Sequence, residues 1–298
     1  MFAELEAGFG LDVVMALQAT SHPLFDILAT LFDFLGGDLG YLLILPLIFW
    51  SIDRKLGQWL LVVLVSALFL LIGGKELFGR PRPFQFDPEQ VIVVVEASGF
   101  GFPSGHVGLS TAMWVFVALW AMRRWGFIVL AAYIPAMAWA RMYAGVHYPQ
   151  DVIGGFVIGL AVACGLFFNR EWLARLWAGL PTAAQAAVIV ISGGAMAVLL
   201  RGDDAGLSAA GILIGGGLGT MLAHRAGPFD SAGTLQQRTL RFVVGMLATL
   251  VVFVALDAAF EPLEPAAVFR VIRYALVTFV ILGLYPVVMA RTGFTQPV

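Results

Sequence analysis

Three short segments of the sequence hold most of the side chains that could act chemically. Each lies at the edge of a long apolar stretch, and together they contribute four cations, two histidines and the carboxylate of Asp151. The segments are Lys75–Pro83 (KELFGRPRP), Pro103–His106 (PSGH) and Arg141–Asp151 (RMYAGVHYPQD). Cations that surround imidazoles are suited to bind and transfer a phosphate group, because phosphate oxygens accept several donors at once.

The cations that we expect to bind the phosphate are Lys75, Arg82 and Arg141, which come from two of the three segments. If they converge on one anion, they stabilise both the bound phosphate and the charge that develops on its equatorial oxygens. Arg80 could bind phosphate as well, but it fits equally well a cation at the end of a membrane-spanning helix that extends its side chain to the membrane surface.

The PSGH segment opens an apolar stretch and predicts the start of a helix. Ser104 is suited to cap that helix, and Gly105 lets a ligand approach the backbone closely. The free N–H groups of the first helical turn bind anions. We therefore expect Ser104 and Gly105 to bind phosphoryl oxygens, and His106 to protonate the leaving oxygen.

The third segment predicts a carboxylate–imidazole pair. Pro149 is tolerated at the first position of a helix, and Asp151 then lies in the first turn, where a negative charge is favoured. From there Asp151 can accept the N–H of His147 and turn the other ring nitrogen toward phosphorus. The motif loops contain no HExxH, no cysteine pair and no acidic cluster. We therefore predict chemistry that needs neither a metal nor another cofactor.

The elements that must position these residues are membrane-spanning helices. Of the 298 residues, 60% are hydrophobic and 12% are charged, whereas soluble domains have about 25% charged residues. The apolar stretches are about 18 to 25 residues long, which is enough to cross a bilayer as a helix. A net charge of −2 gives no positive field that would attract nucleic acid. The sequence predicts an all-α integral membrane protein with about nine spans, at 24–50, 58–75, 106–122, 126–141, 150–168, 182–200, 206–223, 241–258 and 271–290.

We divide the chain into an amphipathic surface segment (1–23), a catalytic core (24–175) and an accessory C-terminal bundle of spans (176–298). Gly36 and Gly37 interrupt the first span. Asp26 and Asp33 in that span are costly in hydrocarbon, so we expect them to face the bundle or the lipid headgroups. The small-residue patterns at 155–159 and 211–215 predict close contacts between helices.

The distribution of cations predicts the orientation in the membrane. One set of loops carries Arg and Lys outside the three segments, and this set is expected to be cytoplasmic. The opposite set carries the three segments, has only Arg201, Arg270 and Arg273 as further cations, and is also acidic. Its acidic residues are Asp203, Asp204, Asp257, Glu261 and Glu264. We therefore predict a multi-pass protein of the bacterial inner membrane whose site faces the periplasm or the exterior.

These segments resemble the three signatures of the type-2 phosphatidic acid phosphatase superfamily. This superfamily includes lipid phosphate phosphatases, glucose-6-phosphatase and the vanadium haloperoxidases. The signatures are Lys-x6-Arg-Pro, Pro-Ser-Gly-His and Ser-Arg-x5-His-x3-Asp, and they are found here at Lys75 to Pro83, at Pro103 to His106, and at Arg141, His147 and Asp151. The one departure is Ala140, which stands in place of the leading serine of the third signature.

The resemblance implies a six-helix phosphatase core followed by additional spans, and a metal-independent hydrolase. It implies that His147 is the nucleophile that forms a phosphohistidine, that Asp151 orients it, and that His106 is the general acid. It also implies that Lys75, Arg82, Ser104, Gly105 and Arg141 bind the phosphoryl oxygens.

A site at the ends of spans favours a lipid substrate held in the bilayer. Phosphatidate, phosphatidylglycerol phosphate and undecaprenyl diphosphate are the candidates. A sugar phosphate, as in glucose-6-phosphatase, and a lipid phosphotransferase stay open as alternatives, as does a transporter or scaffold without chemistry. The sequence does not predict an oligomeric state.

Overall fold

The computed structural model describes residues 6–227 and 230–292, and these residues form helices joined by loops, with no strand among them. The elements are η1 (Glu6–Gly10), α2 (Leu11–Gln18), α3 (Pro23–Gly36), α4 (Asp38–Ser51), α5 (Arg54–Phe78), α6 (Pro83–Phe86), α7 (Gly105–Ala121), α8 (Arg124–Tyr143), α9 (Pro149–Gly179), α10 (Thr182–Leu199), α11 (Asp204–Arg225), α12 (Leu235–Phe260), α13 (Ala266–Phe279), η2 (Val280–Leu284) and α14 (Tyr285–Arg291). The chain is thus an all-α, multi-pass membrane protein.

The chain folds as two compact units. The described part of unit 1 comprises residues 6–41 and 66–168, and that of unit 2 comprises residues 42–65, 169–227 and 230–292. All three sequence signatures therefore lie in unit 1. The predicted boundaries at residues 23 and 175 remain a prediction.

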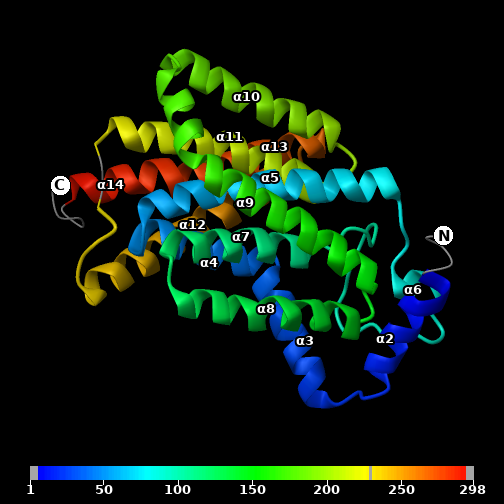
Figure 1. Ribbon diagram of the computed structural model, residues 1–298. Helices are drawn as coiled ribbons and strands as arrows, with labels where there is room; N and C mark the ends of the chain where they lie inside the picture. Colours follow the sequence, from blue (N-terminus) through cyan, green and yellow to red (C-terminus); the bar gives the residue numbers. More distant parts are fainter. Residues whose placement is uncertain (1–5, 228–229, 293–298) are drawn as a thin grey trace. The chain divides into compact units, whose positions relative to one another are not determined.

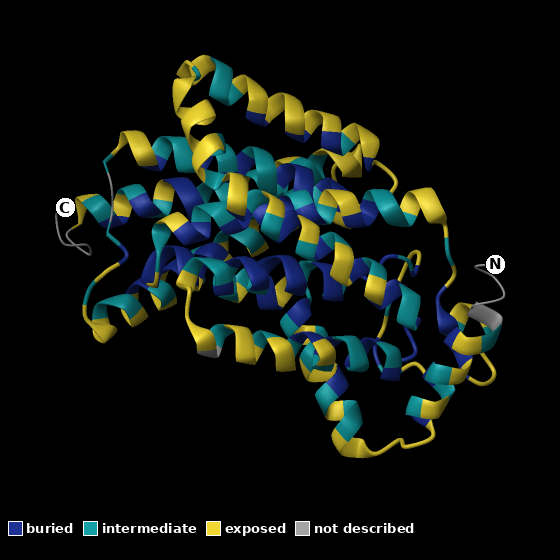
Figure 2. Ribbon diagram, in the orientation of Figure 1, coloured by how far each residue is buried: buried dark blue, intermediate teal, exposed yellow. Residues whose placement is uncertain are grey.

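Unit 1 is built around α7, which packs against α3 and α8 and also contacts α9 (Figure 1). The contact with α9 is close because glycines face the partner backbone. A Cβ at Gly155 would collide with the carbonyl oxygen of Ser104, and one at Gly159 would collide with that of Gly108. The small-residue pattern at 155–159 therefore marks a close helix contact, as predicted. More than half of the α7 residues are buried (Figure 2).

The segment before the first span packs onto unit 1. Val14 of α2 is fully buried beside Leu11, Val91 and Tyr148. The side-chain amide of Gln18 accepts from the N–H of Ile92 at 3.0 Å and donates to its carbonyl oxygen at 2.7 Å. These contacts hold the loop between α6 and α7 against the helices that carry the signatures. Residues 1–5 lie outside the described part of the chain.

Unit 2 has α11 at its centre, in contact with α10 and α13. A Cβ at Gly211 would meet the carbonyl oxygen of Val271, and one at Gly215 would meet that of Ala275, so the second small-residue pattern also lies at a close contact. Arg241 of α12 is fully buried, and its guanidinium donates to the carbonyl oxygens of Trp50 and Asp230. These hydrogen bonds satisfy a charge that would otherwise be costly in the bundle.

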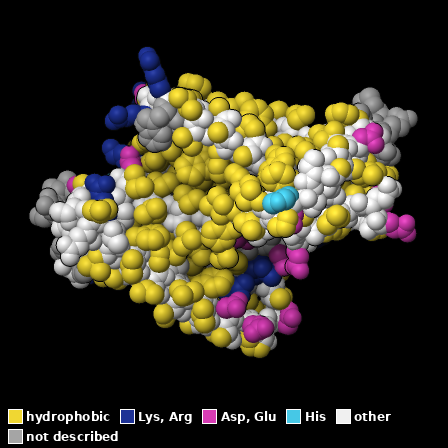
Figure 3. Space-filling view, turned by 90° about the horizontal axis from the view of Figure 1, so that it is seen from below, with side chains coloured by type: hydrophobic (Ala, Val, Ile, Leu, Met, Phe, Trp, Pro, Cys, Tyr) yellow, Lys and Arg dark blue, Asp and Glu magenta, His cyan; other side chains and the backbone are white. Residues whose placement is uncertain are grey.

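The nine predicted spans all fold as helix, but nine membrane crossings are not confirmed. Within the described residues, seven helices are long and apolar enough to cross a membrane. The pair α3 and α4, bent by 54° at the predicted interruption, would make eight. The remaining segment, α7, is apolar but has only 17 residues. Hydrophobic side chains cover most of the face that Figure 3 shows, as a surface in contact with lipid requires.

Candidate active site

His147 and Asp151 lie where α9 begins, and both side chains are buried. Asp151 Oδ2 lies 3.4 Å from His147 Nδ1 and accepts a hydrogen bond of 2.9 Å from the backbone N–H of Tyr148. Because α9 starts at Pro149, its first turn brings residue 151 back beside residue 147. The spacing in the sequence predicted this contact.

Arg82 determines which nitrogen of His147 carries the proton. Nη1 of Arg82 lies 3.2 Å from His147 Nε2, and a guanidinium group can only donate. Nε2 is therefore the acceptor, and the proton of the neutral ring is on Nδ1, the nitrogen that faces Asp151. This tautomer leaves a lone pair on Nε2, as a nucleophilic imidazole requires.

Arg82 is also the cross-link of the loops around the site, and its side chain is buried. Its Nε donates to the carbonyl oxygen of Gly99 at 3.1 Å, and Nη2 donates to that of Ser98 at 2.8 Å. Nη1 donates to the carbonyl oxygen of Val146 at 2.9 Å. With the contact to His147, these bonds occupy four of the five N–H groups that an arginine has. Arg82 therefore has one N–H left for a ligand, and a second when His147 Nε2 turns to another partner.

The electrostatic surroundings keep His147 uncharged. Burial, followed by the positive charges of Arg82, Arg141 and Lys75, holds the pKa of His147 well below its usual range. A cationic imidazole would lose its solvation and be repelled by three neighbours. His147 therefore stays neutral at pH values at which an exposed histidine begins to titrate.

The PSGH segment forms the N-terminus of α7. Ser104 is its N-cap residue and is fully buried, and its N–H donates to the carbonyl oxygen of Asp151 at 2.8 Å. Among the described residues, the Oγ of Ser104 has no hydrogen-bond partner. The Lys75 ammonium group lies 3.9 Å from the position that a Cβ of Gly105 would occupy. A cation, a helix N-terminus and an unpaired hydroxyl thus meet without a side chain at residue 105 between them.

Arg141 and His106 meet at a carboxylate that is in none of the three signatures. Asp33 of α3 forms an ion pair with Arg141 through Oδ1, and the same oxygen lies 3.1 Å from His106 Nε2. Arg141 is buried, and within the described residues its Nε has no hydrogen-bond partner. Sequence reasoning placed Asp33 at the bundle or at the headgroups and assigned it no role. The one sequence signal that could have indicated a role for Asp33 is an acidic residue inside an apolar stretch.

The one departure from the signatures has a packing explanation. Ala140 is fully buried in a cluster with Ala29 and Tyr143, so its methyl group faces apolar neighbours. A serine hydroxyl at this position would need a hydrogen-bond partner in an apolar cluster.

The structure therefore brings the predicted site residues into one region of unit 1. A neutral imidazole, whose Nε2 lone pair faces Arg82, lies among fixed cations. Two buried donors, the Oγ of Ser104 and the Nε of Arg141, have no partner among the described residues. Buried donors without partners are costly, and a bound oxyanion would satisfy them. The arrangement is suited to hold a tetrahedral anion and to attack it.

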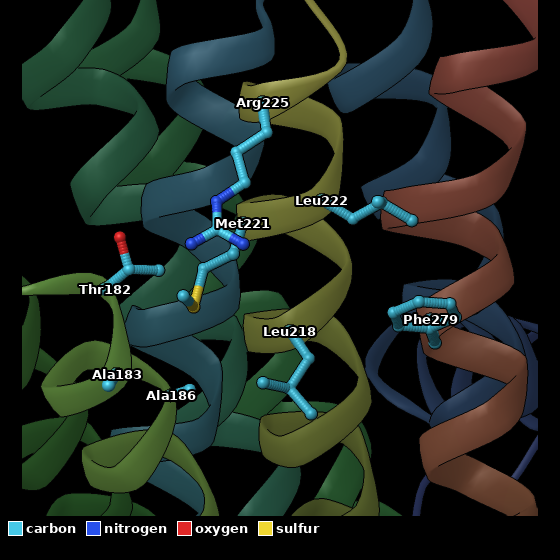
Figure 4. Close-up of a pocket in the computed structure, with 8 residues that line it drawn as sticks. All are labelled: Thr182, Ala183, Ala186, Leu218, Met221, Leu222, Arg225 and Phe279. Carbon is cyan, nitrogen blue, oxygen red and sulfur yellow. The ribbon is translucent and has the colours of Figure 1, made fainter.

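Outside this region the described residues form no comparable group of catalytic side chains. They contain no group of three or more His, Cys, Asp and Glu side chains arranged to hold a metal ion. A cavity of about 470 Å³ in unit 2 is lined mainly by apolar side chains of α10 and α11 (Figure 4). Arg225 is its one charged lining residue, and no acid, base or nucleophile of the kind found in unit 1 accompanies it.

Comparison with known proteins identifies two families along the chain. Residues 56–175 match the PAP2 superfamily, and residues 207–297 match a family described as PAP2 superfamily phosphatase, transmembrane extension. All signature residues fall in the first match, whereas Asp33 precedes it.

Individual relatives match over part of the chain. Sphingosine-1-phosphate phosphatase 1 of Mus musculus is 28% identical over 134 residues, which is 43% of this chain and 31% of that protein. Decaprenylphosphoryl-5-phosphoribose phosphatase of Mycobacterium tuberculosis is 32% identical over 128 residues, 42% of this chain and 68% of that protein. The crystal structure of Aquifex aeolicus LpxE has a TM-score of 0.45 and 27% identity over 53% of this chain and 93% of that chain. The family match over residues 56–175 and the 32% identity to a relative of which the chain covers 68% show that the chain belongs to the PAP2 superfamily.

Proposed function

We propose that this chain is a membrane-embedded phosphatase that hydrolyses a terminal phosphate of a lipid through a phosphohistidine intermediate. One observation carries the proposal. The lone pair on Nε2 of His147 lies among buried cationic donors, and two of the donors around it are unpaired. Such a site favours a tetrahedral phosphoryl group over a neutral ligand, because each unpaired donor gains an anionic acceptor.

In the first step, Nε2 of His147 attacks phosphorus and the bond between phosphorus and the leaving oxygen breaks. His106 gives its proton to that oxygen. Asp151 accepts the N–H of Nδ1 and stabilises the positive charge on the ring. Lys75, Arg82 and Arg141, with the N-terminus of α7 at Ser104 and Gly105, stabilise the charge on the equatorial oxygens.

In the second step, water attacks the phosphohistidine. His106, now neutral, takes a proton from the water as its oxygen bonds to phosphorus, and the phosphorus–nitrogen bond breaks. His147 regains its neutral form, and inorganic phosphate leaves. No step needs a metal ion, since the cationic side chains neutralise the phosphoryl charge.

A lipid is the proposed substrate because the site lies at the ends of apolar helices. The N-termini of α7 and α9 and the C-terminal ends of α5 and α8 all contribute to it. The names of the two curated relatives above denote phosphatases of phosphorylated lipids, but the chain covers only 31% of the first of them. Phosphatidate, phosphatidylglycerol phosphate and undecaprenyl diphosphate are therefore the substrates to test first.

The location follows from the charge pattern of the loops. We place the protein in a bacterial inner membrane with the site at the periplasmic face, since Arg and Lys outside the signatures concentrate in the opposite loops. In this proposal residues 24–175 are the catalytic core and residues 176–298 an accessory bundle. The core is the only part to which we assign chemistry.

The decisive experiment measures phosphate release by the purified protein in detergent. The panel contains the three lipid substrates and glucose 6-phosphate, each with and without a chelator and vanadate. We expect release from at least one lipid, inhibition by vanadate and no effect of the chelator. Hydrolysis of glucose 6-phosphate alone would favour the sugar-phosphate alternative, and phosphoryl transfer to an added lipid alcohol would favour the phosphotransferase.

His147→Ala should lower turnover by at least about 10³-fold, because it removes the nucleophile. His224→Ala is the matched control, since His224 is exposed near the end of α11 in unit 2. Equal activity of the two variants would contradict the mechanism and support a protein without this chemistry.

A further inference from the structure

Asp33 joins the two site residues that the signatures leave without a counterion. Its Oδ1 contacts both His106 Nε2 and Arg141 Nη1. His147 already has a carboxylate of its own in Asp151. Each imidazole of the site is therefore paired with a separate carboxylate, one from α9 and one from α3.

The path of α3 explains how this carboxylate reaches the site. α3 packs against α7 and α8 and ends at Gly36. A Cβ at Gly36 would lie 3.0 Å from the Cδ2 of His106 and 2.7 Å from the Cε of Met137. The absence of a side chain at residue 36 lets the helix end approach the imidazole edge, one turn after Asp33. The His106 ring thus has the carboxylate and the helix backbone as neighbours.

Asp33 can carry a negative charge in a membrane helix because it pairs with cationic partners. A carboxylate in a membrane helix is costly unless it is paired. The Asp33 side chain is 33% exposed and that of Arg141 is 2% exposed, so solvent partly screens the carboxylate but not the guanidinium. An ion pair that fixes a buried guanidinium leaves the remaining N–H groups of that guanidinium in a defined direction. The unpaired Nε of Arg141 is one of these groups.

We propose that Asp33 is the positioning residue for phosphoryl transfer at this site: it orients His106, keeps a proton on its Nε2, and fixes Arg141 for the phosphoryl oxygens. The inference rests on the proposed function and extends it to a helix that precedes the residues matched to the PAP2 superfamily. In the first step the leaving oxygen takes the Nδ1 proton of the His106 imidazolium, whose positive charge Asp33 stabilises, and the Nε2 proton stays hydrogen-bonded to Asp33. In the second step the attacking water returns that proton.

The test uses two esters that differ in their need for a proton. An alkyl phosphate such as dioctanoyl phosphatidate must have its leaving oxygen protonated, whereas p-nitrophenolate leaves from p-nitrophenyl phosphate without a proton. A positioned general acid contributes about 10²- to 10⁴-fold to such a step. The value of kcat/KM reports only the steps up to the phosphohistidine, before the second step that both esters share. For Asp33→Asn we therefore expect kcat/KM to fall at least about 10-fold more on the alkyl ester than on the aryl ester.

The role toward Arg141 has its own readout. Arg141 binds both esters alike, so Asp33→Asn should raise KM for both, and the inhibition constant of vanadate, by the same factor. Tighter vanadate binding would overturn the inference, because it would mean that Asp33 only occupies the anion position. An equal loss of kcat/KM on both esters, or no loss on either, would also overturn it.

Asp26→Asn is the matched control. Asp26 lies on the same helix and accepts a hydrogen bond of 2.6 Å from the hydroxyl of Tyr143, and it makes no ion pair with His106 in the structure. This variant should keep the wild-type ratio of the two rates. A wild-type protein that hydrolyses neither ester would overturn the proposed function itself, which separates that failure from a failure of the role of Asp33.

A comparison with His106→Ala keeps the inference testable if Asp33→Asn is less stable. Adding Asp33→Asn to His106→Ala should lower kcat on the alkyl ester by less than about 3-fold further, because the acid is already absent. A further loss as large as that in the single variant would show that Asp33 acts independently of His106.

Discussion

Replacing Arg82 by lysine tests whether this residue organises the site as well as binding the ligand. The guanidinium group donates to the carbonyl oxygens of Ser98, Gly99 and Val146 and to His147 Nε2. A lysine ammonium is a compact point donor and lacks the planar fork that reaches acceptors on opposite sides. It can serve either the loop at Ser98 and Gly99 or the segment at Val146 and His147.

The expected cost follows from the acceptors that lose their donor. With the ammonium group on the His147 side, the partly buried hydrogen bonds to the carbonyl oxygens of Ser98 and Gly99 are lost. A hydrogen bond contributes about 0.5–1.5 kcal/mol net, so the loss of two should destabilise the protein by about 1–3 kcal/mol. Turnover should fall as well, because the loop that lies against Asp151 loses its anchor. Gly101 of that loop is close enough that a Cβ there would lie 3.1 Å from Asp151 Oδ2.

The assay is thermal unfolding in detergent together with phosphate release. Arg270→Lys is the matched control, since the Arg270 side chain is 31% exposed and pairs with Asp204 at 2.8 Å. A surface ion pair contributes about 0–1 kcal/mol, so this variant should unfold near the wild-type temperature. An Arg82→Lys protein that is as stable and as active as Arg270→Lys would refute the reasoning.

Two further predictions concern pH and orientation. Because burial and the neighbouring cations hold the pKa of His147 below its usual range, the unfolded chain binds a proton there that the folded chain does not. Stability should therefore fall as the pH drops below about 6.5, and His147→Ala should lack this component in unfolding scans at several pH values; an unchanged pH dependence would contradict the assignment. In a Cys164→Ala background, an impermeant thiol reagent added outside intact cells should label Glu89→Cys, whereas Gln236→Cys should react only after permeabilisation; the reverse pattern would overturn the proposed orientation.

Much of the fold could be predicted because its signals are local. An apolar stretch of span length must form a helix, since a backbone in lipid has no other way to satisfy its hydrogen bonds. Close helix contacts at 155–159 and 211–215 could be predicted because a missing side chain lets two backbones approach. The number of crossings could not be predicted in the same way. α7 has 17 residues, and α3 and α4 bend at Gly37, so length alone does not decide whether each crosses.

The contact between Asp151 and His147 could be predicted from the sequence, because it depends only on where a helix starts and on a spacing of four residues. Which nitrogen of His147 carries the proton could be assigned only from the tertiary structure, because Arg82 comes from another loop, 65 residues earlier in the chain. Sequence reasoning made Arg82 a phosphate ligand. The structure adds that most of its donors already bind backbone carbonyl oxygens, which no pattern in the sequence shows.

The sequence by itself determined which chemical groups are available and that they lie at the ends of membrane helices, since residue type and hydrophobic length are properties of each segment alone. Only the tertiary structure decided which groups share a partner. Asp33 lies more than seventy residues before His106 and more than a hundred before Arg141, and it reaches them because α3 packs against α7 and α8 and ends in a glycine. Contacts of this kind depend on how helices pack, and the periodicity of one helix does not encode the position of another.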